Sequence, residues 1–351
     1  MKLSFAKTPH ILSIVAAAAL LAACNKPADN AAPAQTASAP ASTAAATGPV
    51  PAIIFDMGGK FDKSFNEAAY NGMEQFKKET GIQYKEFEIA NEAQREQAIR
   101  RMAEEGASPI IGVGFGQASS IEKIAKEFPA LKFAIIDSVV ADVPNVQSVV
   151  FKEHEGSFLV GVLAAKASKT GKVGFVGGMD IPLIRKFQCG YEQGVKYVNK
   201  KGQIFANMTG TTGAAWNDPA RGGELTKAQF AKGADVVFAA AGGTGIGVYQ
   251  AAKDAGKLAI GVDSNQNHLQ PGTMLTSMVK RVDTAVYNVA KNHTPGISNL
   301  GLKEDGVGVA MDEHNAKLIT DEMKADLEKA KAGILDGSIK VVDFMAANKC
   351  N

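Results

Sequence analysis

Short runs of apolar residues alternate with longer amphipathic stretches along the chain from residue 51 onward. The runs are rich in Ile, Val, Phe and Ala, which predicts buried strands, and the stretches between them have helical spacing. Strands that alternate with helices in this way indicate parallel βαβ units and a doubly wound α/β fold. Ser64, with Glu67 three residues on, is predicted to cap the first helix. The predicted strands are 52–55, 82–88, 109–113, 133–136, 146–151, 172–176, 203–208, 235–239, 258–262, 273–279 and about 306–311, and the predicted helices are 64–79, 92–105, 117–128, 153–168, 182–200, 218–231, 245–255, 281–292 and 320–332.

The elements form two series in tandem, each of about 110 residues, which indicates two similar lobes. In open α/β sheets, ligands bind at the carboxyl ends of the strands. Asp56, Asp137 and Asp263 each follow a predicted strand directly. A single Asp in this place often caps the next helix. Three of them together favour a ligand-binding cleft.

A glycine-rich turn at 242–247 follows a predicted strand and opens a helix. Such turns can hold phosphate groups, but this one lacks the Lys-Ser/Thr pair of a P-loop and has no neighbouring cluster of basic residues. We therefore expect a tight turn whose backbone N–H groups approach the sugar end of a ligand. Gly243 is the candidate binding residue of this turn.

The first 23 residues have the pattern of a secretory signal peptide. Lys2 and Lys7 precede an apolar stretch, 11–23, that is interrupted only by Ser13 and is too short to span a bilayer. It ends in Leu-Ala-Ala-Cys24, which resembles the lipobox of bacterial lipoproteins and implies cleavage before Cys24, lipidation of its sulfur and a membrane anchor. An ordinary signal peptide with a chance cysteine is the alternative. Residues 24–48, rich in Ala and almost uncharged, are predicted to form a flexible tether.

The charge balance argues against nucleic-acid binding. The 351 residues contain 38 Lys and Arg and 36 Asp and Glu, and loss of Lys2 and Lys7 with the signal leaves 36 of each. Affinity for nucleic acid comes mainly from neutralising phosphates, which a neutral chain does poorly. The five His residues are scattered, and neither a zinc-binding cluster nor a catalytic motif is present in the sequence. Neither a metal nor a cofactor is expected.

Three cysteines occur, and two of them, Cys189 and Cys350, follow the signal region and Cys24. If the chain is exported, both lie in an oxidising compartment. A disulfide bond would tie the C-terminal tail to the body. Two separate thiols, one buried and one in a frayed end, are the alternative.

Eight short motifs, with Ala68 and Gly72, resemble the basic membrane protein family of bacterial lipoproteins, and specifically its purine-nucleoside receptors. They occur in family order over about residues 50–345, and it is the ordered set that is specific. The motifs are DMGGKFDKSFN at 56–66, EGSFLVGVLAA at 155–165, GGMDIPLIRKF at 177–187, GYEQGVKYVN at 190–199, WNDPARG at 216–222, AGGTGIGV at 241–248, GVD at 261–263 and SMVKR at 277–281.

This resemblance implies a type I periplasmic-binding fold, with two doubly wound parallel-sheet lobes joined by a hinge of several strands. It implies a monomeric substrate-binding protein that serves the permease and ATPase of an ABC importer. We expect an N-terminal lobe of 49–152 plus 264–295 and a C-terminal lobe of 153–263 plus 296–346.

The resemblance also implies a binding mode. A purine would stack between Phe65 and Trp216, one from each lobe. Asp56, Asn66 and Asp137 would face the edge of the base, and Asp263 and Lys280 would hold ribose hydroxyls. Relatives often have Phe where Trp216 stands, so the stacking surface is larger here and the preferred base can differ.

Two other functions are compatible with the residues. One is a binding protein for another small polar ligand, such as a sugar or a vitamin, for which one stacking face would suffice. The other is an exported enzyme that processes nucleosides or uses a dinucleotide. An enzyme would convert a nucleoside on prolonged incubation, whereas a receptor would return it unchanged.

Overall fold

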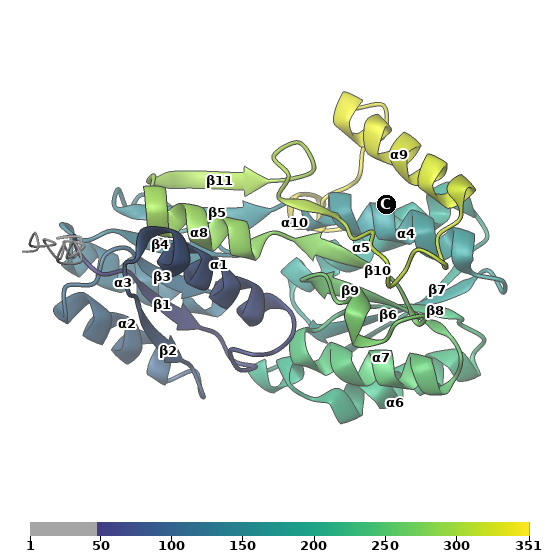
Figure 1. Ribbon diagram of the computed structural model, residues 1–351, viewed down its shortest axis with the longest axis horizontal. Helices are drawn as coiled ribbons and strands as arrows, with labels where there is room; N and C mark the ends of the chain where they lie inside the picture. The colour runs from purple at the N-terminus through teal and green to yellow at the C-terminus, as the bar shows by residue number, and fades with distance from the viewer. Residues whose placement is uncertain (1–47, 351) are drawn as a thin grey trace, which may run out of the picture. The chain divides into compact units, whose positions relative to one another are not determined.

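Figure 1 shows the computed structural model of the protein, in which residues 48–350 are described. The predicted signal peptide 1–23, the lipidation site Cys24 and the tether up to residue 47 lie outside the described residues. Within 48–350, all predicted strands and helices are present, with ends shifted by a few residues. None of the described helices is long and apolar enough to cross a membrane.

Sheet 1 has six strands in the order β11-β5-β4-β3-β1-β2, all paired in parallel. Alternate residues of β1 point to opposite faces: Ile53 and Phe55 pack with α1, whereas Ala52 and Ile54 pack with α2 and α3. Helices cover both faces, which is why the central strands are apolar throughout. The elements are β1 Ala52–Phe55, β2 Lys85–Glu88, β3 Ile110–Val113, β4 Phe133–Ile136, β5 Val146–Phe151 and β11 Gly296–Leu300, with α1 Phe65–Thr80, α2 Gln94–Glu104, α3 Ala118–Glu127 and α8 Val282–Asn292.

Sheet 2 repeats this arrangement in the order β12-β10-β9-β8-β6-β7, with only the β10–β12 pair antiparallel. Helices α4, α5 and α9 lie on one side and α6 and α7 on the other (Figure 1). The elements are β6 Lys172–Met179, β7 Gln203–Gly210, β8 Val236–Ala240, β9 Leu258–Asp263, β10 Met274–Lys280 and β12 Val307–Val309, with α4 Glu153–Ala167, α5 Pro182–Val198, α6 Pro219–Ala231, α7 Gly245–Asp254, α9 Asp321–Asp336 and the short α10 Phe344–Ala347.

The chain passes between the two sheets three times, from β5 to α4, from β10 to α8 and from β11 to β12. Backbone hydrogen bonds join the crossings: the Lys152 N–H donates to the Leu300 carbonyl (2.9 Å), and the Arg281 N–H donates to the Gly306 carbonyl (2.9 Å). These crossings form the expected hinge of several strands. We call sheet 1 with its helices lobe 1, and sheet 2 with its helices lobe 2.

The two sheets divide the chain differently from the lobe boundaries expected above. Strand β10 was placed in the N-terminal lobe with 264–295, yet it pairs with β9 and β12 of sheet 2. Strand β11 was placed in the C-terminal lobe with 296–346, yet it pairs with β5 of sheet 1. The reason for the second difference is that β11 is a largely exposed edge strand whose sequence, GISNL, lacks an apolar run.

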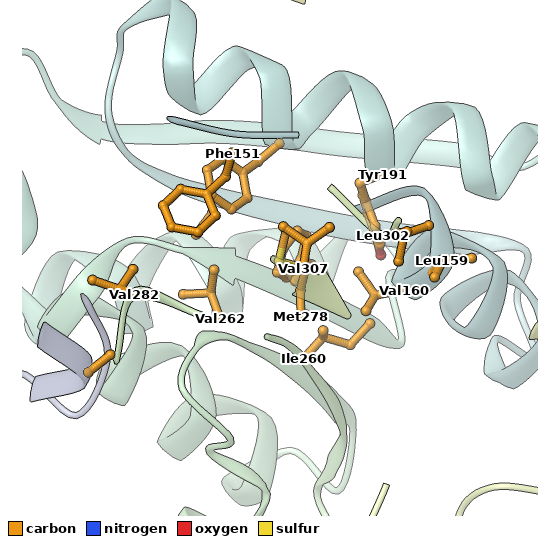
Figure 2. Packing of buried hydrophobic residues seen from close by; sticks show 14 of the residues in the cluster. Phe151, Leu159, Val160, Tyr191, Ile260, Val262, Met278, Val282, Leu302 and Val307 are labelled. Atoms are coloured by element: carbon orange, nitrogen blue, oxygen red, sulfur yellow. The ribbon is translucent and has the colours of Figure 1, made fainter. Parts of the chain in front are cut away.

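One apolar core continues from lobe 1 through the crossings into lobe 2. Figure 2 shows Phe151 of β5, Val262 of β9, Met278 of β10 and Val307 of β12 within this cluster. The same cluster of side chains therefore packs both sheets and the crossings between them.

Helices α4 and α5 approach each other closely because glycines line their contact. A Cβ atom on Gly161 would lie 2.3 Å from the Tyr191 carbonyl oxygen, and one on Gly194 would lie 2.0 Å from the Phe158 carbonyl oxygen. Nearer the start of α5, a disulfide bond joins Cys189 to Cys350, with their Cα atoms 5.1 Å apart. The C-terminal tail is thus tied to the body at this helix.

Replacement of Gly194 by alanine tests this close contact. We expect Gly194→Ala to lower the free energy of unfolding by about 1–3 kcal/mol, because the added methyl group forces the helix backbones apart. Urea unfolding monitored by circular dichroism measures the change. Gly308→Ala is the control, since a Cβ there meets nothing within 4 Å. Equal unfolding midpoints for the two variants would contradict the tight α4–α5 contact.

Candidate functional site

A cavity that is partly open to solvent lies between the lobes and is lined from both, and its space together with its opening measures about 580 Å³. Seven of the eight predicted binding residues line it, and Gly243 does not, although its neighbour Gly242 does. The lining residues are Asp56, Met57, Asp62, Phe65, Asn66, Gly114, Phe115, Asp137, Leu183, Ile184, Phe187, Trp216, Ala240, Ala241, Gly242, Val262, Asp263 and Lys280.

Asp56 follows β1, and the Arg95 guanidinium holds one of its carboxylate oxygens at 3.1 Å. Burial raises the pKa of Asp56, and Arg95 opposes this rise. Gly114, with φ of +100°, allows the close approach of this carboxylate, because a Cβ there would lie 2.5 Å from Asp56 Oδ2. The Asp56 side chain is thus held in place where it lines the cavity.

Asn66 lines the cavity, but its amide group is engaged by the backbone. Its Nδ2 donates to the carbonyls of Asp56 (3.1 Å) and Gly59 (3.2 Å), and its Oδ1 accepts from the Asp56 N–H (3.2 Å). Both amide hydrogens are used in this way. Asn66 therefore holds the β1–α1 loop in place, rather than offering free donors to a base edge.

Asp62 is a cavity residue that the sequence reasoning missed, and its carboxylate, rather than the Ser64 side chain, accepts the first backbone N–H groups of α1. Its carboxylate accepts backbone N–H groups from Ser64 (2.8 Å), Asn66 (3.0 Å) and Glu67 (3.1 Å). Ser64 occupies the N-cap position as predicted, but its side chain makes no capping hydrogen bond. Burial raises the pKa of Asp62 to about 7 against these three donors, and the charge of Asp263 adds to the rise.

Ser64 instead links the two lobes. Its Oγ donates to Asp263 Oδ2 at 2.5 Å, and its carbonyl accepts a hydrogen bond from Ser264 Oγ at 3.0 Å. Asp263 ends β9 in the left-handed conformation, with φ of +62°, which Asp adopts more readily than most residues. Burial raises the pKa of Asp263, an effect that Lys280 and Ser64 oppose.

Lys280 is a buried cation shared by both lobes. Its Nζ lies 2.5 Å from Asp137 Oδ2 in lobe 1 and 3.3 Å from Glu153 Oε1 at the start of α4. Burial works to lower the pKa of Lys280, but the charges of Asp137, Glu153 and Asp263 outweigh burial and raise it. Burial raises the pKa of Asp137 to about 6. The buried Oδ1 of Asp137 has no hydrogen-bond partner within the described part of the chain.

Phe65 and Trp216 come from different lobes and line the same cavity. Phe65 begins α1, and its ring centroid lies 4.9 Å from Lys280 Nζ. Trp216 ends the 3₁₀ helix η2 (Gly213–Trp216), and its indole lies against Gly178, where a Cβ atom would come within 2.2 Å of Cζ3. The cavity is also lined by two aromatic residues that the sequence reasoning did not assign to the site, Phe115 after β3 and Phe187 of α5.

The glycine-rich turn supports the Trp216 loop. A Cβ on Gly243 would lie 3.3 Å from the Trp216 carbonyl oxygen. Thr244 Oγ1 donates to the Ala215 carbonyl at 2.8 Å and accepts from the Asp218 N–H at 2.7 Å. Gly243 is therefore placed behind Trp216, and the turn reaches the cavity through Gly242.

Two α/β lobes joined by three crossings, with a cavity lined by both, are the architecture of two-lobed proteins that bind small ligands. A family model described as "ABC transporter substrate-binding protein PnrA-like" matches residues 50–343, and the chain belongs to this family. Within 48–350, no group of three or more His, Cys, Asp and Glu side chains is arranged to hold a metal ion.

Relatives and solved structures agree with this assignment. The chain is 33% identical over 317 residues to the "ABC transporter nucleoside-binding protein BmpA" of Lactococcus lactis subsp. cremoris, covering 83% of this chain and 88% of that one. It is 35% identical over 293 residues to "Basic membrane protein D" of Borreliella burgdorferi, covering 80% and 84%. The crystal structure of an ABC transporter solute-binding protein from Aeropyrum pernix K1 superimposes with a TM-score of 0.77 at 29% identity, covering 84% of this chain and 94% of that one. The expected family and the type I periplasmic-binding fold are confirmed, and the chain is a substrate-binding protein of an ABC transporter.

The raised pKa of Asp62 predicts a pH dependence of stability. Because its folded pKa of about 7 exceeds the ordinary value of 3.8, ionisation of Asp62 lowers stability progressively as the pH rises between these values. Asp62→Asn should therefore show a smaller fall in Tm than the wild type between about pH 5 and about pH 7.5. Glu67→Gln, in the first turn of the same helix, is the control. Parallel profiles for the wild type and Asp62→Asn would contradict the assignment.

Proposed function

We propose that the protein binds purine nucleosides reversibly in the cavity between its lobes and delivers them to the permease and ATPase of an ABC importer. The observation that carries this proposal is that Phe65 and Trp216, from opposite lobes, line one cavity together with Asp137, Asp263 and Lys280. The naming of the Lactococcus relative as nucleoside-binding supports the same ligand class.

A purine is a flat ring system that gains from aromatic faces on both sides, by about 1–3 kcal/mol per stacked base. The polar groups of the cavity suit the rest of a nucleoside. Asp137 Oδ1 is buried without a partner among the described residues and would accept a hydrogen bond from a ligand N–H or O–H group. Asp263 and Lys280 both line the cavity and suit the vicinal hydroxyl groups of a sugar. Hydrogen bonds between these charged side chains and hydroxyl groups are stronger than hydrogen bonds between neutral groups.

Transport needs a lobe movement and an anchor. The three crossings provide the hinge about which the lobes open to admit the ligand. The contact of Ser64 with Asp263 joins the lobes beside the cavity. In this proposal a lipid on Cys24 holds the exported monomer at the membrane surface, close to the permease.

Isothermal titration calorimetry of the purified protein against nucleosides, free bases, sugars and vitamins tests the ligand class. We expect purine nucleosides to bind most tightly and to be recovered unchanged after prolonged incubation. Tighter binding of a sugar or a vitamin would show that purine nucleosides are not the ligand class of this protein. Conversion of the nucleoside would make the protein an enzyme.

Trp216→Ala tests the stacking. We expect it to weaken purine-nucleoside binding about tenfold or more, because one aromatic face is lost. Phe61→Ala is the matched control, since Phe61 is a 60% exposed aromatic residue outside the cavity lining. An unchanged Kd in Trp216→Ala would refute the stacking site.

Asp263→Ala tests the polar wall of the cavity. Loss of its carboxylate removes an acceptor for the ligand and a charge facing Lys280, so we expect binding to weaken about tenfold or more. Asp305→Ala is the control, because the Asp305 side chain is 82% exposed and lies outside the cavity lining. This change should leave Kd unchanged. Wild-type affinity in Asp263→Ala would exclude this residue from the site.

A further inference from the structure

A buried chain of charges connects the ligand cavity to the C-terminal tail. Lys280 lines the cavity, and Glu153 Oε1 lies 3.3 Å from its Nζ. The second oxygen of the same carboxylate, Oε2, lies 3.0 Å from Lys186 Nζ on α5. Lys186 Nζ in turn lies 3.6 Å from Asp343 Oδ2, next to α10. Glu153 thus bridges two lysines, one at the cavity and one beneath the tail.

Burial makes the members of this chain depend on one another. The side chains of Glu153 and Lys280 are 1% and 2% exposed, and that of Lys186 is 7% exposed. Lys186 also donates to the Phe151 carbonyl at 2.6 Å, at the first crossing between the lobes. A buried charge that loses its partner is strongly unfavourable, so its neighbours must shift to compensate.

His154 is the other titratable group that faces Asp343, with Nδ1 4.0 Å from Oδ2. Burial, and after it the charge of Lys186, lower the pKa of His154 to about 4. His154 is therefore neutral at pH 7, which leaves Lys186 as the buried cation that faces the tail.

The C-terminal segment, residues 341–350, is fixed to α5 at three places. Gln193 exchanges two hydrogen bonds with the Val342 backbone (3.1 and 2.8 Å), the disulfide joins Cys189 to Cys350, and α10 packs against α5 (Figure 1). The same helix lines the ligand cavity through Leu183, Ile184 and Phe187. Thus α5 contacts the tail along one side and the cavity along another.

We propose that Glu153 and Lys186 are positioning residues through which the C-terminal segment sets ligand affinity, by holding Lys280 in place at the cavity wall. This inference rests on the proposed function of the same cavity. It assigns a role in binding to residues that do not line the cavity, and to a tail that a disulfide bond ties to α5.

Lys186 gives the first test, by calorimetry with a purine nucleoside and with the free base. Lys186→Met should weaken nucleoside binding about tenfold. Affinity for the free base should change less, because Lys280 is proposed to hold the sugar. Lys186→Arg keeps the charge and should restore most of the nucleoside affinity. Equal losses for nucleoside and base, or no rescue by arginine, would overturn the positioning role.

Asp343 gives a second test in case Lys186→Met does not fold, because Asp343 is partly exposed. Asp343→Asn and Cys350→Ser should each weaken nucleoside binding about threefold. Asp343→Asn should have no further effect in a Lys280→Met background, since it acts through that lysine. Asp321→Asn, at the exposed start of α9, is the matched control. Equal effects in both backgrounds, or none in either, would overturn the inference.

The wild-type titration separates this inference from the proposed function. A wild type that binds nucleoside, with variants unaffected, removes only the role of the C-terminal segment. A wild type that binds no nucleoside removes the proposed function, and this inference falls with it.

Discussion

The arrangement of the cavity depends on one buried ammonium group. Lys280 Nζ lies between Asp137 of lobe 1 and Glu153 at the first crossing, with its side chain 2% exposed. Removing each ion from water costs several kcal/mol, which only close opposite charges and good hydrogen bonds can offset. The lysine and its carboxylates must therefore be placed together. The crossings that carry Lys280 and Glu153 bring them there from distant parts of the chain.

This constraint shapes what the cavity can accept. Lys280 is enclosed by the rings of Phe65, Phe151 and Phe187, whose centroids lie 4.9, 5.2 and 5.5 Å from Nζ. Cation–π attraction adds to the ion pairs and keeps the ammonium in place. Apart from Asn66, whose amide group is engaged by the backbone, the remaining polar side chains of the cavity are carboxylates, which accept hydrogen bonds. A neutral ligand rich in N–H and O–H groups satisfies such a site, whereas an anionic ligand would meet several carboxylates.

The sequence predicted the parts of the fold and site that local patterns encode. Apolar runs located the buried strands, and Asp56, Asp137 and Asp263 were found because strand ends in α/β sheets face ligands. Strand β11 was missed because an exposed edge strand needs no apolar run. Asp62 and Glu153 were missed for a different reason. Each resembles an ordinary acidic residue near a helix start, and only the packing of distant segments buries them.

The two sheets also explain why an aspartate from each lobe lies near enough to Lys280 for its charge to raise the pKa of the lysine. Reading each sheet in order, β4 and β9 occupy equivalent positions, and so do β5 and β10. Asp137 directly follows β4 and has φ of +69°, and Asp263 is the last residue of β9 and has φ of +62°. The same backbone conformation therefore recurs in both lobes. Lys280 ends β10, where its counterpart β5 ends in the apolar Phe151. The equivalent strand ends of the two sheets thus supply two carboxylates, Asp137 and Asp263, but only one cation, Lys280. Because the carboxylates outnumber the cation, carboxylate oxygens remain that a ligand in the cavity could contact.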